Sequence, residues 1–334
     1  MSVYPRVTAT AHPNIALVKY WGKRHTGLNL PAAGSISLTL DGLHTTTSVQ
    51  FSPDLDADQI HLNDALLPQK PAARLSAFLD IVRQRAGIEH RAQVHTQNDF
   101  PTSAGLASSA SGFAALATAA THAAGLDLQP RELSILARKG SGSAARSIFG
   151  GWVEMLPGSQ ENGSGEDSYA LQLHDQSYWD LRCLVAVCAQ GPKKIGSTEA
   201  MLNTAHTSPY YDAWIEDVPR AIAEAKNALQ NKDFQQLAEV SEASCLRMHA
   251  CAMGANPGIL YWKGITVELI HFVRTLRAAG TPVFFTIDAG PHIKAFCTPE
   301  AEEAVANALR EVPGVLDILH TRGGAGARIQ QASD

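Results

Sequence analysis

The pattern of apolar and polar residues predicts mostly strands in the first half of the chain. Alternating runs over 36–40 and 45–51 flank Asp41-Gly42, a dipeptide typical of two-residue turns, so we expect a β-hairpin there. Apolar residues then follow one helical stripe over 70–86, where Gly87 is placed to end the helix. Short strands are also expected at 91–96, 152–156, 169–173 and 184–189.

The second half of the chain has a stronger helical pattern. Ser208-Pro209 is typical of a helix cap followed by a first-turn proline, and apolar residues follow on one face. We expect further helices over 233–252, 264–279 and 299–310, and a strand over 283–287. The sequence therefore predicts an α/β (α+β) protein with a strand-rich domain over residues 1–182 and a helix-rich domain over residues 183–334.

Composition and charge narrow the possible functions. The 334-residue chain is 45% apolar and 18% charged, which is typical of folded domains. Its net charge of −5 and its lack of Lys/Arg runs argue against nucleic acid as a partner, but leave room for a local pocket that binds a small anion. No apolar run reaches the roughly 18 residues that span a bilayer, and the first residues do not resemble a signal peptide, so no membrane partner is expected. Five cysteines without a CxxC pair favour buried free thiols in the cytoplasm.

The segment from Pro101 to Gly112 is the richest in small residues. Glycines let backbone N–H groups approach an anion, serine hydroxyls add donors, and the helix that follows directs its positive end to the same point. These features favour binding of nucleotide phosphates, although neither GxxxxGK(S/T) nor GxGxxG occurs here. The alternative is a small-residue helix that packs closely on a neighbour.

Two other segments carry groups suited to anionic ligands. A strand is followed by Lys19, Tyr20 and Lys23, which predicts either an anion pocket or a solvated strand end. Ser141 and Arg146 lie among residues too small to block access, and the planar fork of an arginine matches a carboxylate. The alternative places Arg146 on the surface, at the start of a helix.

Asp288 lies where an apolar strand breaks into Gly290-Pro291. An ionised carboxylate there needs a partner; it is either a general base whose pKa is set by a nearby lysine, or a residue that stabilises the turn. The thirteen histidines form no HExxH motif, so no metal site is predicted. Surface or hydrogen-bonded interior positions are expected for His12, His249, His271 and His292.

Together these segments resemble the diphosphomevalonate decarboxylases, a family of the GHMP kinase superfamily. The resemblance rests on NIALVKYWGKR, FPTSAGLASSASGFAAL, ARKGSGSAARSIFGG, KKIGST and TIDAGP, which follow the order and spacing of the family. The chain departs from the usual family residues at Ala145, Gly196, Ala200 and His292.

The resemblance implies a two-domain GHMP kinase-like fold with the active site in the cleft between the domains. It also implies that ATP with Mg²⁺ phosphorylates the C3 hydroxyl of mevalonate 5-diphosphate, after which phosphate and CO₂ leave and isopentenyl diphosphate forms. A homodimer is expected on the same ground. The alternatives are a relative that takes mevalonate 5-phosphate, a mevalonate 3-kinase, and a catalytically silent ligand-binding relative.

The same resemblance assigns roles to residues at matching positions. Asp288 is the expected base at the C3 hydroxyl, and Lys19 is expected to keep it ionised. Arg146 and Ser141 would hold the substrate carboxylate. The remaining substrate contacts are expected from Tyr20 and Lys23, at the diphosphate, and from Ser197. The ATP phosphates are expected to lie over Pro101, Gly105, Leu106, Ala107, Ser108 and Ser109.

Overall fold

The computed structural model describes residues 4–100, 108–159, 163–189, 191 and 194–330. Within these ranges the strands form a six-stranded sheet, an eight-stranded sheet and a small two-stranded sheet, β3 (Lys23–His25) with β4 (Leu30–Pro31). No helix in this part of the chain is both long and apolar enough to cross a membrane.

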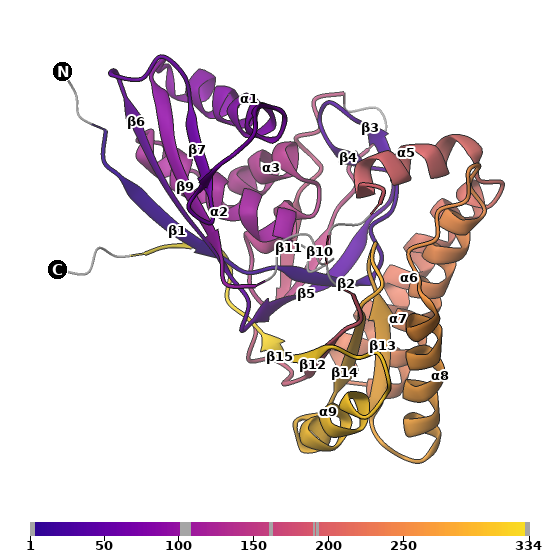
Figure 1. Ribbon diagram of the computed structural model, residues 1–334. Helices are drawn as coiled ribbons and strands as arrows, with labels where there is room; N and C mark the ends of the chain where they lie inside the picture. The colour runs from indigo at the N-terminus through magenta and orange to yellow at the C-terminus, as the bar shows by residue number, and fades with distance from the viewer. Residues whose placement is uncertain (1–3, 101–107, 160–162, 190, 192–193, 331–334) are drawn as a thin grey trace.

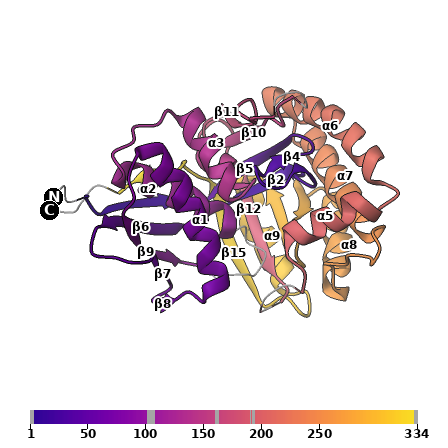
Figure 2. The ribbon, with the colours of Figure 1, turned by 90° about the horizontal axis from the view of Figure 1, so that it is seen from above.

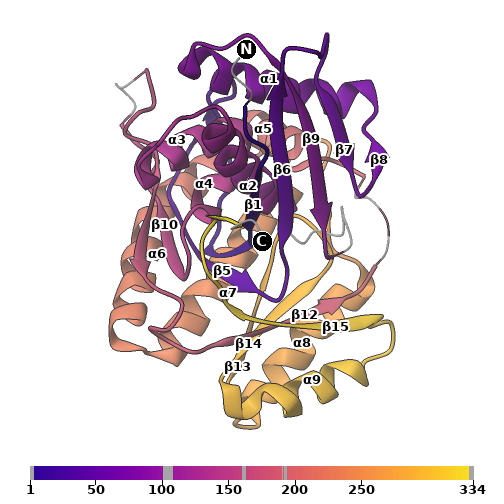
Figure 3. The same cartoon turned by 90° about the vertical axis from the view of Figure 1, so that its left-hand side faces the viewer.

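The six-stranded sheet has the order β16-β1-β6-β9-β7-β8. Its strands are β1 (Val7–Ala11), β6 (Thr45–Ser52), β7 (Gln59–Leu62), β8 (Ala65–Leu66), β9 (Arg91–Asn98) and β16 (Arg328–Ile329). Helices α1 (Gln69–Ala86), α2 (Ser108–Ala123) and α3 (Pro130–Gly140) lie on the face of this sheet that points into the molecule (Figures 1 and 2). Its other face is turned toward the viewer in Figure 3. The many buried alanines of α2 let this helix lie close to β1 and β6.

The eight-stranded sheet has the order β11-β10-β5-β15-β12-β14-β13, and β2 also pairs with β5. Its strands are β2 (Asn14–Val18), β5 (Ser35–Asp41), β10 (Trp152–Met155), β11 (Ala170–His174), β12 (Arg182–Val187), β13 (Val283–Ile287), β14 (Ile293–Cys297) and β15 (Asp317–Gly323). Because β15 pairs with both β12 and β5, this sheet runs without a break from the first half of the chain into the second. The predicted boundary between residues 182 and 183 stays a prediction.

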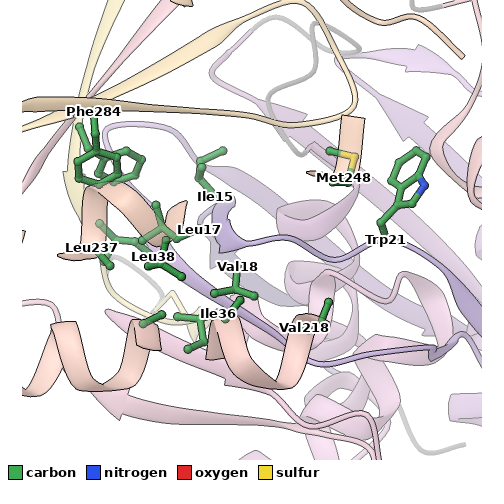
Figure 4. Packing of buried hydrophobic residues seen from close by; sticks show 14 of the residues in the cluster. Ile15, Leu17, Val18, Trp21, Ile36, Leu38, Val218, Leu237, Met248 and Phe284 are labelled. Atoms are coloured by element: carbon green, nitrogen blue, oxygen red, sulfur yellow. The ribbon is translucent and has the colours of Figure 1, made fainter. Parts of the chain in front are cut away.

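The remaining helices are α4 (Ala144–Ser147), α5 (Ser197–Thr207), α6 (Tyr211–Asn231), α7 (Phe234–Met253), α8 (Gly264–Ala278) and α9 (Glu302–Arg310). Strand β2 is buried along its whole length because α6 and α7 cover it. Figure 4 shows Ile15, Leu17 and Val18 of β2 packed with Ile36 of β5 and Leu237 of α7. A separate core lies between β12–β14 and the helices α8 and α9. The first of these cores packs α6 and α7 of the second half against β2.

The predicted hairpin at Asp41-Gly42 is wrong in its pairing, although both strands exist. Strand β6 pairs with β1 and β9, whereas β5 pairs with β2, β10 and β15. Every residue of β5 except Asp41 is buried, but only every second residue of β6 is. A strand covered on both faces belongs in the middle of the larger sheet, so the turn at Gly42 carries the chain from one sheet to the other.

The predicted helix start at Ser208-Pro209 is also wrong. Ser208 follows the end of α5, a helix that the sequence pattern did not indicate, and α6 begins at Tyr211. The Ser208 hydroxyl donates a hydrogen bond to the Cys251 carbonyl at 2.7 Å, so it anchors the connection between the helices on α7. In contrast, the end of α1 at Gly87 is confirmed, with this glycine in the left-handed region at φ 65°. All five cysteines are buried free thiols, as predicted.

Gly151, directly before β10, provides a test of the close packing between this strand and the end of β11. Its φ is 66°, and a Cβ added to it would lie 2.4 Å from the His174 carbonyl oxygen. Gly125 has a similar φ of 75° but open space around it, so it is the matched control. Gly125→Ala should lower the free energy of unfolding by about 1–2 kcal/mol, because alanine disfavours the left-handed backbone. Gly151→Ala should lower it by about 1–3 kcal/mol more, because the new Cβ would also overlap the His174 carbonyl oxygen. Denaturant unfolding measures both, and equal losses would contradict this account.

Candidate active site

A cavity of about 530 Å³ lies between the two predicted halves, which is within the range of about 300–1,000 Å³ typical of ligand pockets. Its wall includes residues of β2, α2 and α4 from the first half, and of α5, α7 and the end of β13 from the second. The predicted site residues that line it are Lys19, Tyr20, Lys23, Ser108, Ser109, Ser141, Arg146, Ser197 and Asp288. Pro101, Gly105, Leu106 and Ala107 lie outside the described residues.

Lys19 and Asp288 form an ion pair in this cavity. Lys19 follows the last residue of β2, Asp288 follows the last residue of β13, and Lys19 Nζ lies 2.7 Å from Asp288 Oδ1. Helix α7 holds both strand ends, because the Ser244 hydroxyl accepts a hydrogen bond from the Lys19 backbone N–H at 3.0 Å and His249 Nε2 lies 3.3 Å from the Ile287 carbonyl oxygen. One helix therefore sets the distance between the two charges.

A second lysine, Lys294 of β14, also faces Asp288. Its Nζ lies 3.8 Å from Asp288 Oδ2, and its side chain is completely buried. Burial alone raises the pKa of Asp288, but the positive charges of Lys19, Lys294 and Arg146 outweigh it and hold that pKa below its usual value. Lys294 was not predicted as a site residue, although a lysine within an apolar strand after Asp-Ala-Gly-Pro was a visible signal.

Arg146 is buried in the wall of the cavity, so its alternative placement on the surface is wrong. Its Nε donates to Asn14 Oδ1 at 3.1 Å and to Ser37 Oγ at 3.0 Å, and its Nη1 donates to Ser35 Oγ at 2.7 Å. These bonds fix the plane of the guanidinium group. Burial lowers the pKa of Arg146 to about 10, so it stays charged at neutral pH. Ser35 and Ser37 were not predicted as partners of Arg146. Their spacing of two residues, which places both on one face of β5, was the signal that could have identified them.

Tyr20 brings a buried hydroxyl to the same wall. A Cβ on Gly142 would lie 2.3 Å from the Tyr20 hydroxyl oxygen, so a glycine is required beside this ring. Among the described residues this hydroxyl has no hydrogen-bond partner, and burial raises its pKa to about 12, which keeps it protonated. A buried hydroxyl without a partner in a cavity wall is suited to donate to a ligand oxygen.

Lys23 of β3 extends its side chain to the beginning of α5. Its Nζ donates to Asn29 Oδ1 at 2.6 Å and to Thr198 Oγ1 at 3.0 Å. Ser197 is the first residue of this helix, whose positive end adds to the charge of Lys23 and of the neighbouring Arg74. Burial and Arg74 together lower the pKa of Lys23 to about 8. This part of the cavity is therefore suited to a phosphate group. Thr198 ends the KKIGST segment but was given no role, and no sequence signal marked Arg74.

Ser108 and Ser109 begin α2, whose first turn lines the cavity. The Ser141 hydroxyl donates to Ser109 Oγ at 3.5 Å, which places Ser141 between this helix and Arg146. The small residues of α2 thus allow close packing along the helix, and those in its first turn leave the cavity accessible. Both interpretations of this segment are compatible with the structure.

The histidines behave as expected. His12, His249 and His292 are buried and hydrogen-bonded, and His271 is exposed on α8. His292 Nδ1 accepts a hydrogen bond from the Cys188 backbone N–H at 3.0 Å, so this unusual residue joins the turn after Asp288 to β12. Within the described residues no three His, Cys, Asp or Glu side chains are grouped so that they could hold a metal ion.

Two family models match this chain. One is described as the diphosphomevalonate decarboxylase-like N-terminal domain and matches residues 11–170; the other is described as the mevalonate 5-diphosphate decarboxylase C-terminal domain and matches residues 183–323. The chain belongs to the diphosphomevalonate decarboxylase family.

Curated relatives and solved structures of this family agree. The diphosphomevalonate decarboxylase of Homo sapiens is 37% identical over 87% of this chain and 76% of its own length. The Candida albicans enzyme is 35% identical over 92% of this chain and 89% of its own length. The Staphylococcus aureus mevalonate diphosphate decarboxylase structure matches with a TM-score of 0.93 and 39% identity over 99% of each chain. A structure of MDDEF in complex with MVAPP, AMPPCP and magnesium matches with a TM-score of 0.92 and 38% identity, over 99% of this chain and all of that one. These matches confirm the two-domain GHMP kinase-like fold of the diphosphomevalonate decarboxylases.

The burial of His249 predicts that the free energy of unfolding depends on pH. Burial lowers its pKa to about 3, so between pH 3 and about 6.5 the unfolded chain binds a proton that the folded chain does not. Above pH 6.5 protonation of His249 does not reduce the free energy of unfolding. As the pH falls below 6.5, the free energy of unfolding decreases by about 1.4 kcal/mol per pH unit, or by about 2 kcal/mol at pH 5. His249→Gln should reduce the fall in unfolding free energy between pH 7 and 5 by that amount. Denaturant unfolding at both pH values is the measurement, with exposed His271→Gln as control; a wild-type fall in His249→Gln would refute the assignment.

Proposed function

We propose that the chain catalyses the ATP-dependent decarboxylation of mevalonate 5-diphosphate to isopentenyl diphosphate, with release of ADP, phosphate and CO₂. The observation that carries this proposal is the Asp288 carboxylate, held 2.7 Å from Lys19 in a cavity that also contains the buried fork of Arg146. A base and a carboxylate-binding arginine in one cavity are what phosphorylation and loss of a neighbouring carboxylate require. Membership of the diphosphomevalonate decarboxylase family supports the same reaction.

In this proposal Asp288 accepts the proton of the C3 hydroxyl while that oxygen attacks the γ-phosphorus of ATP. Arg146 and Ser141 hold the C1 carboxylate in the orientation that the loss of CO₂ requires. The C3–O bond then breaks with loss of phosphate, and the electron pair of the C1–C2 bond forms the C2–C3 double bond as CO₂ leaves. Arg146 can hold the carboxylate in one orientation because Asn14, Ser35 and Ser37 fix its plane.

The phosphate groups of both substrates are assigned to the cationic parts of the cavity. Tyr20, Lys23 and Ser197 would bind the diphosphate of mevalonate 5-diphosphate near the start of α5. The ATP phosphates would lie at the start of α2, over Ser108 and Ser109 and the segment that contains Pro101, Gly105, Leu106 and Ala107. Mg²⁺ bound to these phosphates would neutralise part of their charge, and the serine hydroxyls and water would complete its ligands. The AMPPCP and magnesium in the related structure support the use of ATP with Mg²⁺.

The oligomer and the compartment remain predictions, as a homodimer in the cytoplasm. The five buried thiols support a reducing compartment. Mevalonate 5-phosphate decarboxylase and mevalonate 3-kinase activities are the alternatives. Two neighbouring cations, Lys23 and Arg74, favour the more highly charged diphosphate.

The function is tested by incubation with ATP and Mg²⁺ and each of mevalonate, mevalonate 5-phosphate and mevalonate 5-diphosphate. ADP and CO₂ should form in equal amounts from the diphosphate, and much more slowly from the other two. ADP without CO₂ would establish a kinase instead, and CO₂ from the monophosphate alone would establish the sister enzyme. If neither product formed, the chain would be a binding protein.

Asp288→Asn tests the proposed base. Asparagine keeps the size of the side chain but cannot accept the proton, so kcat should fall by about 10²–10⁴-fold. Binding of ATP and mevalonate 5-diphosphate should change by less than roughly tenfold, because Asp288 contacts neither set of phosphates in this scheme. Single-turnover ADP release and calorimetric binding separate the two effects.

Asp217→Asn is the matched control, since the Asp217 carboxylate on α6 is paired with Arg247 and has nearly the same side-chain exposure, 22% against 23% for Asp288. Turnover within a few-fold of wild type in a correctly folded Asp288→Asn variant would reduce Asp288 to a turn residue.

A further inference from the structure

Lys294 lies in the middle of a buried sheet. It belongs to β14, between β12 and β13, and its register partners are Val185 and Thr286. Its side chain is 0% exposed. An ammonium group so far from water is strongly disfavoured unless an anion balances it, so packing alone does not account for a lysine at this position.

The anion that faces Lys294 is Asp288. Oδ2 of this carboxylate lies 3.8 Å from Lys294 Nζ, whereas Oδ1 accepts a hydrogen bond from Lys19 Nζ at 2.7 Å. A separation of 3.8 Å is too long for a hydrogen bond, so Lys294 acts on the carboxylate through its charge. The two carboxylate oxygens are therefore held unequally, Oδ1 tightly and Oδ2 loosely.

The other titratable groups around Asp288 come from α4, α7 and β12. Arg146 of α4 adds a third positive charge. Burial lowers the pKa of His249 to about 3 and raises the pKa of Cys245 to about 11 and that of Cys183 to about 12, so these three groups are neutral at neutral pH. Burial lowers the pKa of Lys294, and the negative charge of Asp288 opposes that shift. With Lys294 charged, three positive groups surround one carboxylate, which is more than a purely structural ion pair requires.

We propose that Lys294 is a positioning residue for Asp288, which keeps the carboxylate ionised and leaves Oδ2 as the oxygen that accepts the proton. This inference rests on the proposed function. In the phosphorylation step the O–H bond of the C3 hydroxyl breaks, its oxygen bonds to the γ-phosphorus, and ADP leaves with the electron pair of the broken P–O bond. The proton passes to Oδ2, while Lys19 keeps its hydrogen bond to Oδ1.

Lys294→Met tests this role because it removes the charge but keeps a side chain of similar length. An opposite charge within about 4–6 Å lowers a carboxyl pKa by about 1–3 units, so the acid limb of the kcat profile should move at least one pH unit higher. Lys294→Arg retains the charge and should keep the acid limb in place, even if turnover falls. Lys226→Met breaks the pair between Lys226 and Glu154, 2.8 Å apart and away from the cavity, and should leave the profile unchanged.

The ionisation of Asp288 can also be followed without turnover, from the ¹³C shift of its carboxyl group in ligand-free protein, with Asp288→Asn for assignment. In wild type it should stay ionised below the ordinary aspartate pKa of about 3.9, and in Lys294→Met it should titrate at least one unit higher. An unchanged titration in folded Lys294→Met overturns the proposal. So does a wild-type carboxyl that titrates at or above its ordinary value, a result that needs no variant to fold. Failure of the proposed function is a separate outcome, because wild type would then release no CO₂ from mevalonate 5-diphosphate whatever the titration shows.

Discussion

The ion pair between Lys19 and Asp288 is the interaction on which the rest of the site depends. The two residues are 269 positions apart in the sequence, and each follows directly after a buried strand. A charged pair withdrawn from water is tolerated only where the geometry holds both groups close together. Helix α7 meets this condition, because Ser244 holds the backbone at Lys19 while Cys245 and His249 hold the backbone at Ile287. The first half of the chain must therefore dock on α7, which belongs to the second half, before this ion pair can form.

The electrostatics of the cavity differ from those of the whole chain. The chain carries a net charge of −5, yet five cationic side chains from different elements meet in or beside the cavity: Lys19, Lys23, Arg74, Arg146 and Lys294. Burial lowers the pKa of Lys23 and Arg74, which shows the cost of gathering these charges where water is scarce. An anionic ligand in this cavity would supply negative charge and so stabilise the charged forms of these side chains.

The strands and long helices were largely predictable because they depend on local periodicity. The stripe of α1 and its terminal glycine, the alternation of β6 and the apolar run of β13 all follow from neighbouring residues. Strand pairing was not predictable from the Asp41-Gly42 turn, since the choice of partner depends on which faces are buried in the finished sheet. Helix α5 was missed because its buried face consists of only a few residues, Ala200, Met201 and Thr204.

The sequence by itself determined the family and the residue types that line the cavity, because the long motifs carry their own glycines, serines and charges. It also determined that Asp288 needed a partner, since an ionised carboxylate beside an apolar strand cannot remain unpaired. Only the tertiary structure decided that Arg146 is buried with Asn14, Ser35 and Ser37, and that Lys294 faces Asp288. The physical reason is that electrostatic and hydrogen-bond energies depend on distances of a few ångströms between segments far apart in the chain, and the order of residues does not contain those distances.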